Sequence, residues 1–275
     1  MGLAATEFDY LCKFIRERSA IIIDPGKEYL VESRLTPLAY QEGLDSAQKL
    51  LERLRGEPVN GLHRKVLDAM TNNETIFFRD AAPFQALSKT VVPELLGKRA
   101  PERRLSFWSA AASSGQEAYS LAMLVCDDFA GLPGWEISIL GTDISAAILD
   151  RARQGRYSQL EVNRGLPAKF LTRHFTREGV EWQISDHVRS MVDFKELNLA
   201  GSWSSLPQFD VVFLRNVLIY FSVEKKKEIL RRLRSAMRED GVLFLGSAET
   251  TLNLDDSFDR VPWENTSYYR LRKQG

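Results

Sequence analysis

Residues 105–117 read LSFWSAAASSGQE, and this stretch decides the fold class of the chain. An apolar strand pattern ends in small residues and Gly115, and a helical pattern follows directly over 116–129. Small side chains and a glycine allow a tight turn from strand to helix, and they let a ligand approach the backbone closely. The stretch therefore predicts a strand, a turn and a helix, the first unit of an open α/β sheet.

Strand-like and helical segments alternate through the rest of the chain. Strands are predicted over 105–110, 137–143, 192–198, 209–216 and 242–247, with helices over 116–129, 146–154 and 224–238. The last two strand patterns, 258–261 and 267–272, have no helix-length segment between them. This alternation predicts a parallel sheet with right-handed crossovers, completed by an antiparallel hairpin at one edge.

Residues 155–191 interrupt the alternation, because they are too long and too polar for one crossover helix. Val180–Ile184 and Val188–Val192 have strand character, so we expect a small hairpin pair inserted in the sheet domain. The first seventy residues are different, with helical periodicity and no lasting alternation of period two. Helices are predicted there from Thr6 onward, opened by a capping-box variant at Thr6–Asp9, and over 27–42, 44–55 and 61–70.

The predicted organisation is a small helical domain over 1–70, a linker and lid over 71–100, and a sheet domain over 101–275. The 275 residues are 44% hydrophobic and 27% charged, as in ordinary globular proteins. Lys plus Arg and Asp plus Glu both number 37, so the formal net charge is zero. A protein that grips a nucleic-acid backbone usually has a basic excess, so nucleic acid is not expected as a partner.

Membrane and metal signals are both missing from the sequence. No apolar run approaches the roughly 18 residues that span a bilayer, and the N-terminus lacks the pattern of a signal peptide. Cys12, Cys126 and the three scattered histidines form no ligand spacing. We expect a soluble cytoplasmic protein that contains no metal.

Polar residues at the ends of the predicted strands are the candidate site. Ligands of open α/β sheets bind at the carboxyl ends of the strands, and an acid after the second strand often holds ribose hydroxyls. Asp143 occupies that position, although it or Ser145 could instead cap the following helix. Ser113 and Ser114 could likewise be simple helix caps. The phosphate-binding glycine patterns are absent, so the ligand predicted here is a nucleoside without phosphates.

Two further strand ends and the linker add candidates. Asn198 and the pair Arg215-Asn216 end strands, where their side chains could bond an adenine edge or a carboxylate, or could serve turn chemistry alone. Arg79 in the linker could clamp a carboxylate, or it could be a surface residue of a hinge. The basic run over 225–234 is predicted to be the solvated face of a helix that covers the sheet.

Several of these segments together resemble the CheR family of chemotaxis-receptor methyltransferases. They carry the family's motifs in its order and spacing, namely Asn73-x-Thr75-x-Phe77-Phe78-Arg79, Trp108–Ser113, Glu117–Ser120, Asp143-Ile144 and Arg215–Phe221. The resemblance runs to the end of the chain. It implies a Rossmann-like, S-adenosylmethionine-dependent methyltransferase sheet with a small inserted β-subdomain over about 155–191, preceded by an all-helical domain that docks on the receptor.

The resemblance also implies an activity and a set of site residues. The activity is methyl esterification of glutamates on cytoplasmic helices of methyl-accepting chemotaxis receptors, with S-adenosylhomocysteine as product. Arg79 and Tyr220 would line the transfer site, with Glu117 facing the methionyl ammonium and Asp143 the ribose. The implied cofactor contacts are Asn73, Thr75, Arg79, Glu117, Asp143, Asn198, Leu199, Asn216 and Val217.

Two departures from the family pattern change what is expected. Gln116 stands where many members carry an acid, and the hairpin around Arg177–Val180 is several residues shorter than in members that bind a receptor tether. We therefore expect a monomeric, tether-independent enzyme that is recruited to membrane receptor arrays without inserting in the membrane. The alternatives are a catalytically silent module that binds S-adenosylmethionine or receptor, and a methyltransferase of another carboxylate.

Overall fold

The computed structural model describes residues 3–128, 134–203 and 206–272. It divides into two compact units, which are considered separately. The helical unit comprises Met1–Asn72 together with Tyr220–Lys225, and the sheet unit comprises Asn73–Ile219 and Lys226–Gly275. No helix in the described part of the chain is long and apolar enough to cross a membrane.

The helical unit contains four helices around a core of its own. They are α1 (Ala5–Ser19), α2 (Glu28–Gln41), α3 (Ala47–Gly56) and α4 (Gly61–Met70), which confirms the predicted helices. Leu11, Ile15, Leu35 and Leu50 are fully buried between them. The capping box predicted at Thr6–Asp9 is wrong, because α1 begins at Ala5 without a side-chain cap. The N–H groups of Leu3 and Ala4, just before the helix, donate to Glu32 and Gln48.

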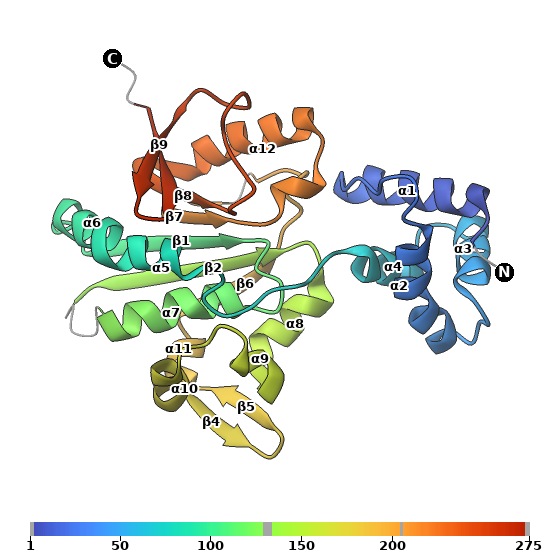
Figure 1. Cartoon of the computed structure of the whole chain (residues 1–275), viewed down its shortest axis with the longest axis horizontal. Helices are drawn as coiled ribbons and strands as arrows, with labels where there is room; N and C mark the ends of the chain where they lie inside the picture. The colour runs from blue at the N-terminus through green and yellow to red at the C-terminus, as the bar shows by residue number, and fades with distance from the viewer. Residues whose placement is uncertain (1–2, 129–133, 204–205, 273–275) are drawn as a thin grey trace. The chain divides into compact units, whose positions relative to one another are not determined.

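The sheet unit is built on seven strands in the order β6-β2-β1-β7-β8-β10-β9 (Figure 1). The strands are β1 (Arg104–Ala110), β2 (Glu136–Asp143), β6 (Val192–Glu196), β7 (Phe209–Leu214), β8 (Met237–Leu245), β9 (Phe258–Trp263) and β10 (Thr266–Leu271). The first five in sheet order are parallel, and β10 is antiparallel to both of its neighbours. The predicted parallel sheet with an antiparallel edge hairpin is confirmed.

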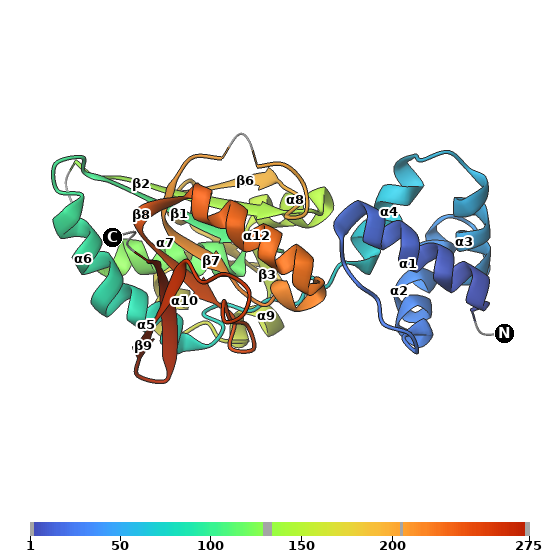
Figure 2. The same cartoon turned by 90° about the horizontal axis from the view of Figure 1, so that it is seen from above.

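Helices cover both faces of this sheet. Phe107, Phe213 and Phe244 pack in one cluster with α7 (Gln116–Asp128) and the helical segment before β1. Successive strand residues point to opposite faces, so Trp108 lies on the other side, where it contacts Trp203. A shallow pocket is lined by Trp203 together with residues of α12 (Val223–Ala236), which therefore covers that second face. Ile229, Leu230 and Leu233 of α12 are buried, as predicted for the basic helix. Seen from above, α12 lies over the strands of the sheet (Figure 2).

The segment before β1 differs from the prediction. Residues 81–98 were expected to belong to a linker, but they form α5 (Ala81–Ala86), a π-helical turn over Leu87–Val91 and α6 (Val92–Lys98). Phe84, Leu87 and Val91 are buried in the main core. The linker prediction is therefore wrong beyond residue 80, because an apolar face at helical spacing makes this segment part of the sheet unit.

The inserted segment folds as a small subdomain of helices and strands. It follows α8 (Ala146–Gln154), the helix after β2. It contains β3 (Arg156–Ser158), α9 (Gln159–Asn163), α10 (Ala168–His174), β4 (Phe175–Glu178), β5 (Glu181–Ile184) and α11 (Asp186–Arg189). The strands form an antiparallel sheet in the order β3-β5-β4. The strand predicted over Val188–Val192 is wrong. Val188 lies on α11 and packs in the core, and only Val192 begins a strand, β6.

Candidate functional site

The register of the parallel strands brings four chain segments to one edge of the sheet. Ala110 of β1 lies opposite Thr142 of β2 and Leu214 of β7, and Leu214 in turn lies opposite Leu245 of β8. The residues that follow these positions leave the sheet at the same edge. β2 and β6 lie on one side of β1, and β7 and β8 lie on the other, so the strand order reverses between β1 and β7. This edge is therefore the topological switch point where open α/β sheets bind ligands.

The turn after β1 has an unusual backbone. Ala111 (φ 60°) and Ser113 (φ 51°) are left-handed without being glycine, and Gly115 follows with φ 93°. A side chain at Gly115 would lie 3.1 Å from Ala152, Phe194 and Tyr119, so a larger residue is excluded there. The hydroxyl of Ser113 donates to the carbonyl of Asn73 at 2.8 Å, and that of Ser114 donates to Gln116 at 2.8 Å. Neither serine caps α7 in the described structure. The interpretation of Ser113 and Ser114 as simple helix caps is therefore not supported, and the turn exposes backbone groups to a ligand.

Asp143 holds this turn against the end of β2. Its side chain is 7% exposed, and its Oδ2 accepts the N–H of Ser113 at 2.9 Å. Its Oδ1 accepts the N–H of Ser145 at 3.1 Å. The cap of the next helix is Ser145, whose hydroxyl accepts the N–H of Ile148 at 3.3 Å. Of the two alternatives at this position, helix capping therefore falls to Ser145, and the carboxylate of Asp143 stands at the ligand edge.

Glu117 faces a buried arginine. Its Oε1 accepts the Ser109 hydroxyl at 2.8 Å, and its Oε2 accepts Nη1 of Arg215 at 3.1 Å. The other guanidinium nitrogen of Arg215 donates to Asp80 at 2.8 Å. Burial raises the pKa of Glu117 above its ordinary value, although the charge of Arg215 opposes this rise. One cation thus stands between two carboxylates, which leaves a net negative charge at this point.

Glu249 joins the ends of β7 and β8. Its Oε1 accepts the N–H groups of Val217 (2.9 Å) and Leu218 (2.7 Å), and its Oε2 accepts those of Asn216 (2.8 Å) and Gly246 (2.7 Å). A side chain at Gly246 would lie 2.7 Å from this carboxylate and 2.9 Å from the backbone of Asn216. Four N–H donors on one carboxylate fix the loop that begins at Asn216.

Asn216 is the first residue of that loop. It is left-handed (φ 58°), and its side-chain Oδ1 is buried with no hydrogen-bond partner in the described part of the chain. Buried polar atoms are nearly always paired in native proteins, so this oxygen marks a place for a ligand N–H. Val217 follows directly and is half-buried.

The other predicted site residues lie around this edge or outside the sheet unit. Asn198 follows β6 and accepts the N–H of Ala200 at 2.9 Å, which is turn chemistry, and Leu199 is buried beside it. Thr75 is half-buried, and Arg79 donates to the carbonyl of Glu74 at 3.4 Å. Tyr220 belongs to the helical unit, where its hydroxyl accepts the Asn72 amide at 2.5 Å.

The segment over 73–79 is anchored by its aromatic residues. Phe77 is fully buried against Tyr157 and Phe175 of the inserted subdomain. The N–H of Phe78 donates to the Ser120 hydroxyl of α7 at 2.9 Å. Together with the bond from Ser113 to Asn73, these contacts lay the segment beside the turn after β1.

Sequence reasoning missed Asp80 and Glu249. Asp80 lies in the predicted linker, and its pairing with Arg215 depends on the fold. Glu249 could have been found by the argument used for Asp143, because it also follows a strand end, three residues after Gly246. No group of three or more His, Cys, Asp and Glu side chains that could hold a metal occurs among the described residues.

The chain matches two family models. Residues 6–71 match the model described as CheR methyltransferase, all-alpha domain, and residues 73–266 match CheR methyltransferase, SAM binding domain. Chemotaxis protein methyltransferase 1 of Pseudomonas aeruginosa is 41% identical over 277 residues, covering 99% of this chain and 100% of that protein. Chemotaxis protein methyltransferase Cher2 of Pseudomonas putida is 40% identical over 266 residues, covering 95% and 96%. The chemotaxis protein methyltransferase of Escherichia coli is 32% identical over 265 residues, covering 94% and 89%.

Proposed function

Because this chain belongs to the CheR family of S-adenosylmethionine-dependent methyltransferases, we propose that it methylates glutamate side chains of bacterial chemoreceptors. The products are a glutamate methyl ester and S-adenosylhomocysteine. The observation that carries the proposal is the pair of acids beside the turn after β1, Glu117 and Asp143. Asp143 at the end of β2 suits the ribose hydroxyls of the cofactor, and Glu117 in the first turn of α7 suits its ammonium group.

The residues at this edge fit S-adenosylmethionine. The small residues of the turn after β1 let a ligand approach the backbone closely. The carboxylates of Glu117 and Asp143 complement the positive charge of the cofactor. Oδ1 of Asn216 is a buried acceptor without a partner in the described structure. We assign the cofactor contacts to nine residues, Asn73, Thr75, Arg79, Glu117, Asp143, Asn198, Leu199, Asn216 and Val217.

The proposed acceptor chemistry needs no base from the protein. When bound, S-adenosylmethionine supplies a methyl group on a positively charged sulfur. A glutamate side chain has an ordinary pKa of about 4.3, so it is already an anionic nucleophile at neutral pH. Attack then depends on positioning and on exclusion of water. We assign Arg79 and Tyr220 to the transfer site, where the guanidinium of Arg79 would orient the incoming carboxylate.

The helical unit is the proposed docking surface for cytoplasmic receptor helices, since a small substrate would need no second domain. The hairpin between β4 and β5 supports the expectation of tether independence. Glu178 pairs with Glu181, so only Gly179 and Val180 connect the two strands. We propose a monomer that works in the cytoplasm at the receptor arrays without inserting in the membrane.

The test is transfer of labelled methyl from S-adenosylmethionine to membranes that contain chemoreceptors. Label on a receptor band that mild alkali releases is the expected result, because methyl esters hydrolyse under these conditions. S-adenosylhomocysteine affinity is measured in parallel by calorimetry.

Three other outcomes would contradict the proposal in different ways. Alkali-stable label would indicate that the methylated atom is a nitrogen or a sulfur and not a carboxylate oxygen. Binding of S-adenosylhomocysteine without any labelling would favour a catalytically silent module. Alkali-labile label on a small molecule, with none on receptors, would indicate another carboxylate acceptor.

A further inference from the structure

The segment that carries Arg79 turns through two left-handed residues. Phe78 (φ 47°) and Asp80 (φ 53°) lie on either side of Arg79, and neither is a glycine. A left-handed backbone at a bulky residue persists only where the surrounding structure holds it in place. Arg79 does not hold the turn itself, because among the described residues its guanidinium makes one long hydrogen bond, 3.4 Å to the carbonyl of Glu74, and no ion pair. The conformation at Arg79 therefore depends on its two neighbours.

Phe78 fixes the turn on the side toward the core. Its ring stacks on Phe170, with 4.6 Å between the ring centroids, and lies edge-on to Phe84 at 5.2 Å. Its N–H donates to the Ser120 hydroxyl at 2.9 Å. These contacts hold one end of the turn, so the position of Arg79 is set by how Asp80 is held at the other end.

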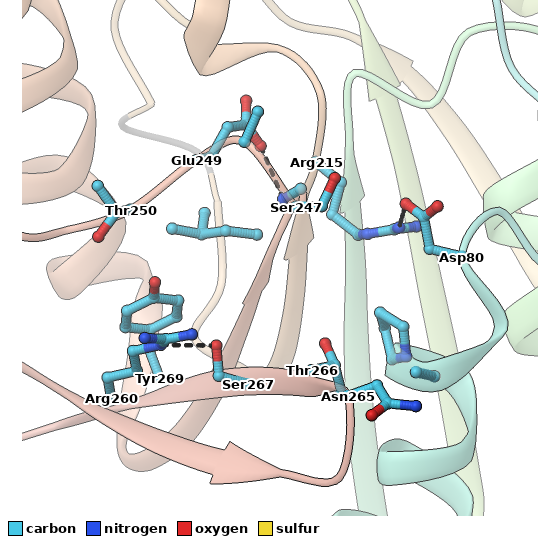
Figure 3. Close-up of a pocket in the computed structure, with 15 residues that line it drawn as sticks. Asp80, Arg215, Ser247, Glu249, Thr250, Arg260, Asn265, Thr266, Ser267 and Tyr269 are labelled. Atoms are coloured by element: carbon cyan, nitrogen blue, oxygen red, sulfur yellow. Dashed lines mark hydrogen bonds and ion pairs between the residues drawn. The ribbon is translucent and has the colours of Figure 1, made fainter.

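Asp80 is held by an ion pair with a buried arginine. Its Oδ2 accepts Nη2 of Arg215 at 2.8 Å, as Figure 3 shows. The side chain of Arg215 is 1% exposed and its Nη1 donates to Glu117, so this anchor is itself fixed. An aspartate at the N-cap position usually accepts an N–H of the helix that follows. Asp80 stands at that position before α5, yet its side chain makes no capping hydrogen bond in the described structure. Its carboxylate is therefore committed to Arg215 and not to the helix.

This ion pair lies at the wall of a pocket. The pocket has a volume of about 550 Å³ and is also lined by Arg260 and Tyr269 of the hairpin of β9 and β10 (Figure 3). The side chain of Asp80 is 49% exposed, and an ion pair with so exposed a partner contributes little to the free energy of unfolding. Without Asp80, Arg215 would still be paired with Glu117, so no buried charge would lose its last partner. The pair is thus suited to fixing the conformation of the turn and not to stabilising the fold.

We propose that Asp80 is a positioning residue for Arg79. The ion pair with Arg215 keeps the left-handed turn in one conformation and so sets where the guanidinium of Arg79 meets the acceptor carboxylate. This inference rests on the proposed function, because that function supplies the role of Arg79. It adds a task for Asp80, a residue that is assigned no contact with the cofactor or the acceptor.

The test compares two substitutions of Asp80 in the full chain, with receptor-containing membrane vesicles as substrate. Asp80→Ala should lower kcat/KM for alkali-labile methyl transfer about tenfold, because a displaced guanidinium no longer orients the incoming carboxylate. Asp80→Asn should lower it less than about threefold, since asparagine tolerates a left-handed backbone and its Oδ1 can still accept from Arg215. The urea midpoint of unfolding should stay nearly unchanged in both variants.

A double-mutant cycle shows whether Asp80 acts through Arg79. Arg79 is also a proposed cofactor contact, so Asp80→Ala should weaken the binding of S-adenosylhomocysteine about threefold in calorimetric titration. The same substitution should cause no further loss in an Arg79→Ala background, and this measurement needs neither receptor nor turnover. Asp259→Ala is the matched control, because the side chain of Asp259 is 53% exposed and pairs with Arg272. It should change neither the rate nor the affinity.

Three results would overturn this role of Asp80. Full kcat/KM in Asp80→Ala would show that the turn needs no such anchor. An Asp80→Asn variant as slow as Asp80→Ala would show that the charge matters and not the conformation of the turn. A loss of affinity that persists in the Arg79→Ala background would assign Asp80 to the site of Glu117. A wild-type enzyme that labels no receptor would instead overturn the proposed function, while the cycle of affinities would still decide whether Asp80 acts through Arg79.

Discussion

Single acids at the ligand edge of the sheet perform different tasks in this protein. Asp143 and Glu249 each accept backbone N–H groups and so hold loops in place, whereas Glu117 accepts side-chain donors from Ser109 and Arg215. A carboxylate that accepts several N–H bonds is strongly stabilised, and an isosteric amide cannot replace it because its NH2 group repels a donor. The roles of these residues can therefore be separated by Asp→Asn and Glu→Gln substitutions.

Asp143→Asn should lower the affinity for S-adenosylhomocysteine about tenfold or more, because a charged hydrogen-bond acceptor is worth roughly 1.5–3 kcal/mol. Calorimetric titration measures this directly. Asp150→Asn is the control, since Asp150 is exposed on α8 and pairs only with Arg153 among the described residues. Equal affinity in the two variants would remove Asp143 from the ribose site.

Glu249→Gln should lower both the affinity for S-adenosylhomocysteine and the free energy of unfolding. The loop over 216–218 carries two proposed cofactor contacts, and the substitution turns at least one of its N–H bonds into a clash of donors. We expect a loss of about tenfold in affinity, and Glu239→Gln at an exposed position should show none. A variant that is less stable but binds normally would limit Glu249 to a role in folding.

At the scale of elements, ion pairs tie peripheral helices to the sheet. Arg270 of β10 donates to Glu94 of α6 at 3.0 Å, and Lys98 lies 2.8 Å from the same carboxylate. The hydrogen bond from Arg270 is the main reason that the pKa of Glu94 is lowered to about 2. Its pKa in the unfolded chain is about 4.3, so the charged form stabilises the fold above that pH.

This pair predicts a defined pH dependence of stability. The difference in urea midpoint between wild type and Glu94→Gln should be constant from neutral pH to about pH 5, and should decline as the pH falls toward 2. The corresponding difference in the free energy of unfolding should be below about 1 kcal/mol, because the side chains of the pair are partly exposed. A difference that grows on acidification would contradict this assignment.

The two units of the molecule have separate hydrophobic cores. The core of the helical unit contains Leu11, Leu35 and Leu50, whereas the core of the sheet unit contains Phe107, Phe213 and Phe244. A ligand that binds one unit stabilises that unit against unfolding. S-adenosylhomocysteine should therefore slow hydrogen exchange in peptides of the sheet unit more than in those of α1–α4.

Leu50→Ala should destabilise the helical unit by about 2–5 kcal/mol, since Leu50 is fully buried. Peptides of α1–α4 should then exchange faster by mass spectrometry, while the affinity for S-adenosylhomocysteine stays within a factor of about two. Tyr40→Ala, at an exposed position of α2, serves as the control. A parallel loss of cofactor affinity in Leu50→Ala would show that the two cores do not act independently.

The sequence alone determined the elements of this protein, because strands, helices and turns depend on local periodicity. The strands around 105–110 and 137–143 and the turn at Gly115 were predicted in the correct places, and Asp143 was correctly placed at the end of the second strand. The motifs shared with the CheR family identified the family of the chain. Prediction from local patterns was wrong where a short apolar run is compatible with more than one type of secondary structure. Residues 81–98 and Val188 are examples, since burial against distant residues decides their conformation.

Only the tertiary structure decided which side chains meet. Strand order and register bring Arg215 between Glu117 and Asp80, and place the carboxylate of Glu249 against the loop after β7. The pocket beside Arg260 and Tyr269 likewise exists only because β10 returns antiparallel to β8. The contacts of Arg215 and of Glu249 with the loop after β7 join residues from 31 to 135 positions apart. No periodicity in the sequence indicates such pairings, because they depend on how the strands are ordered in space.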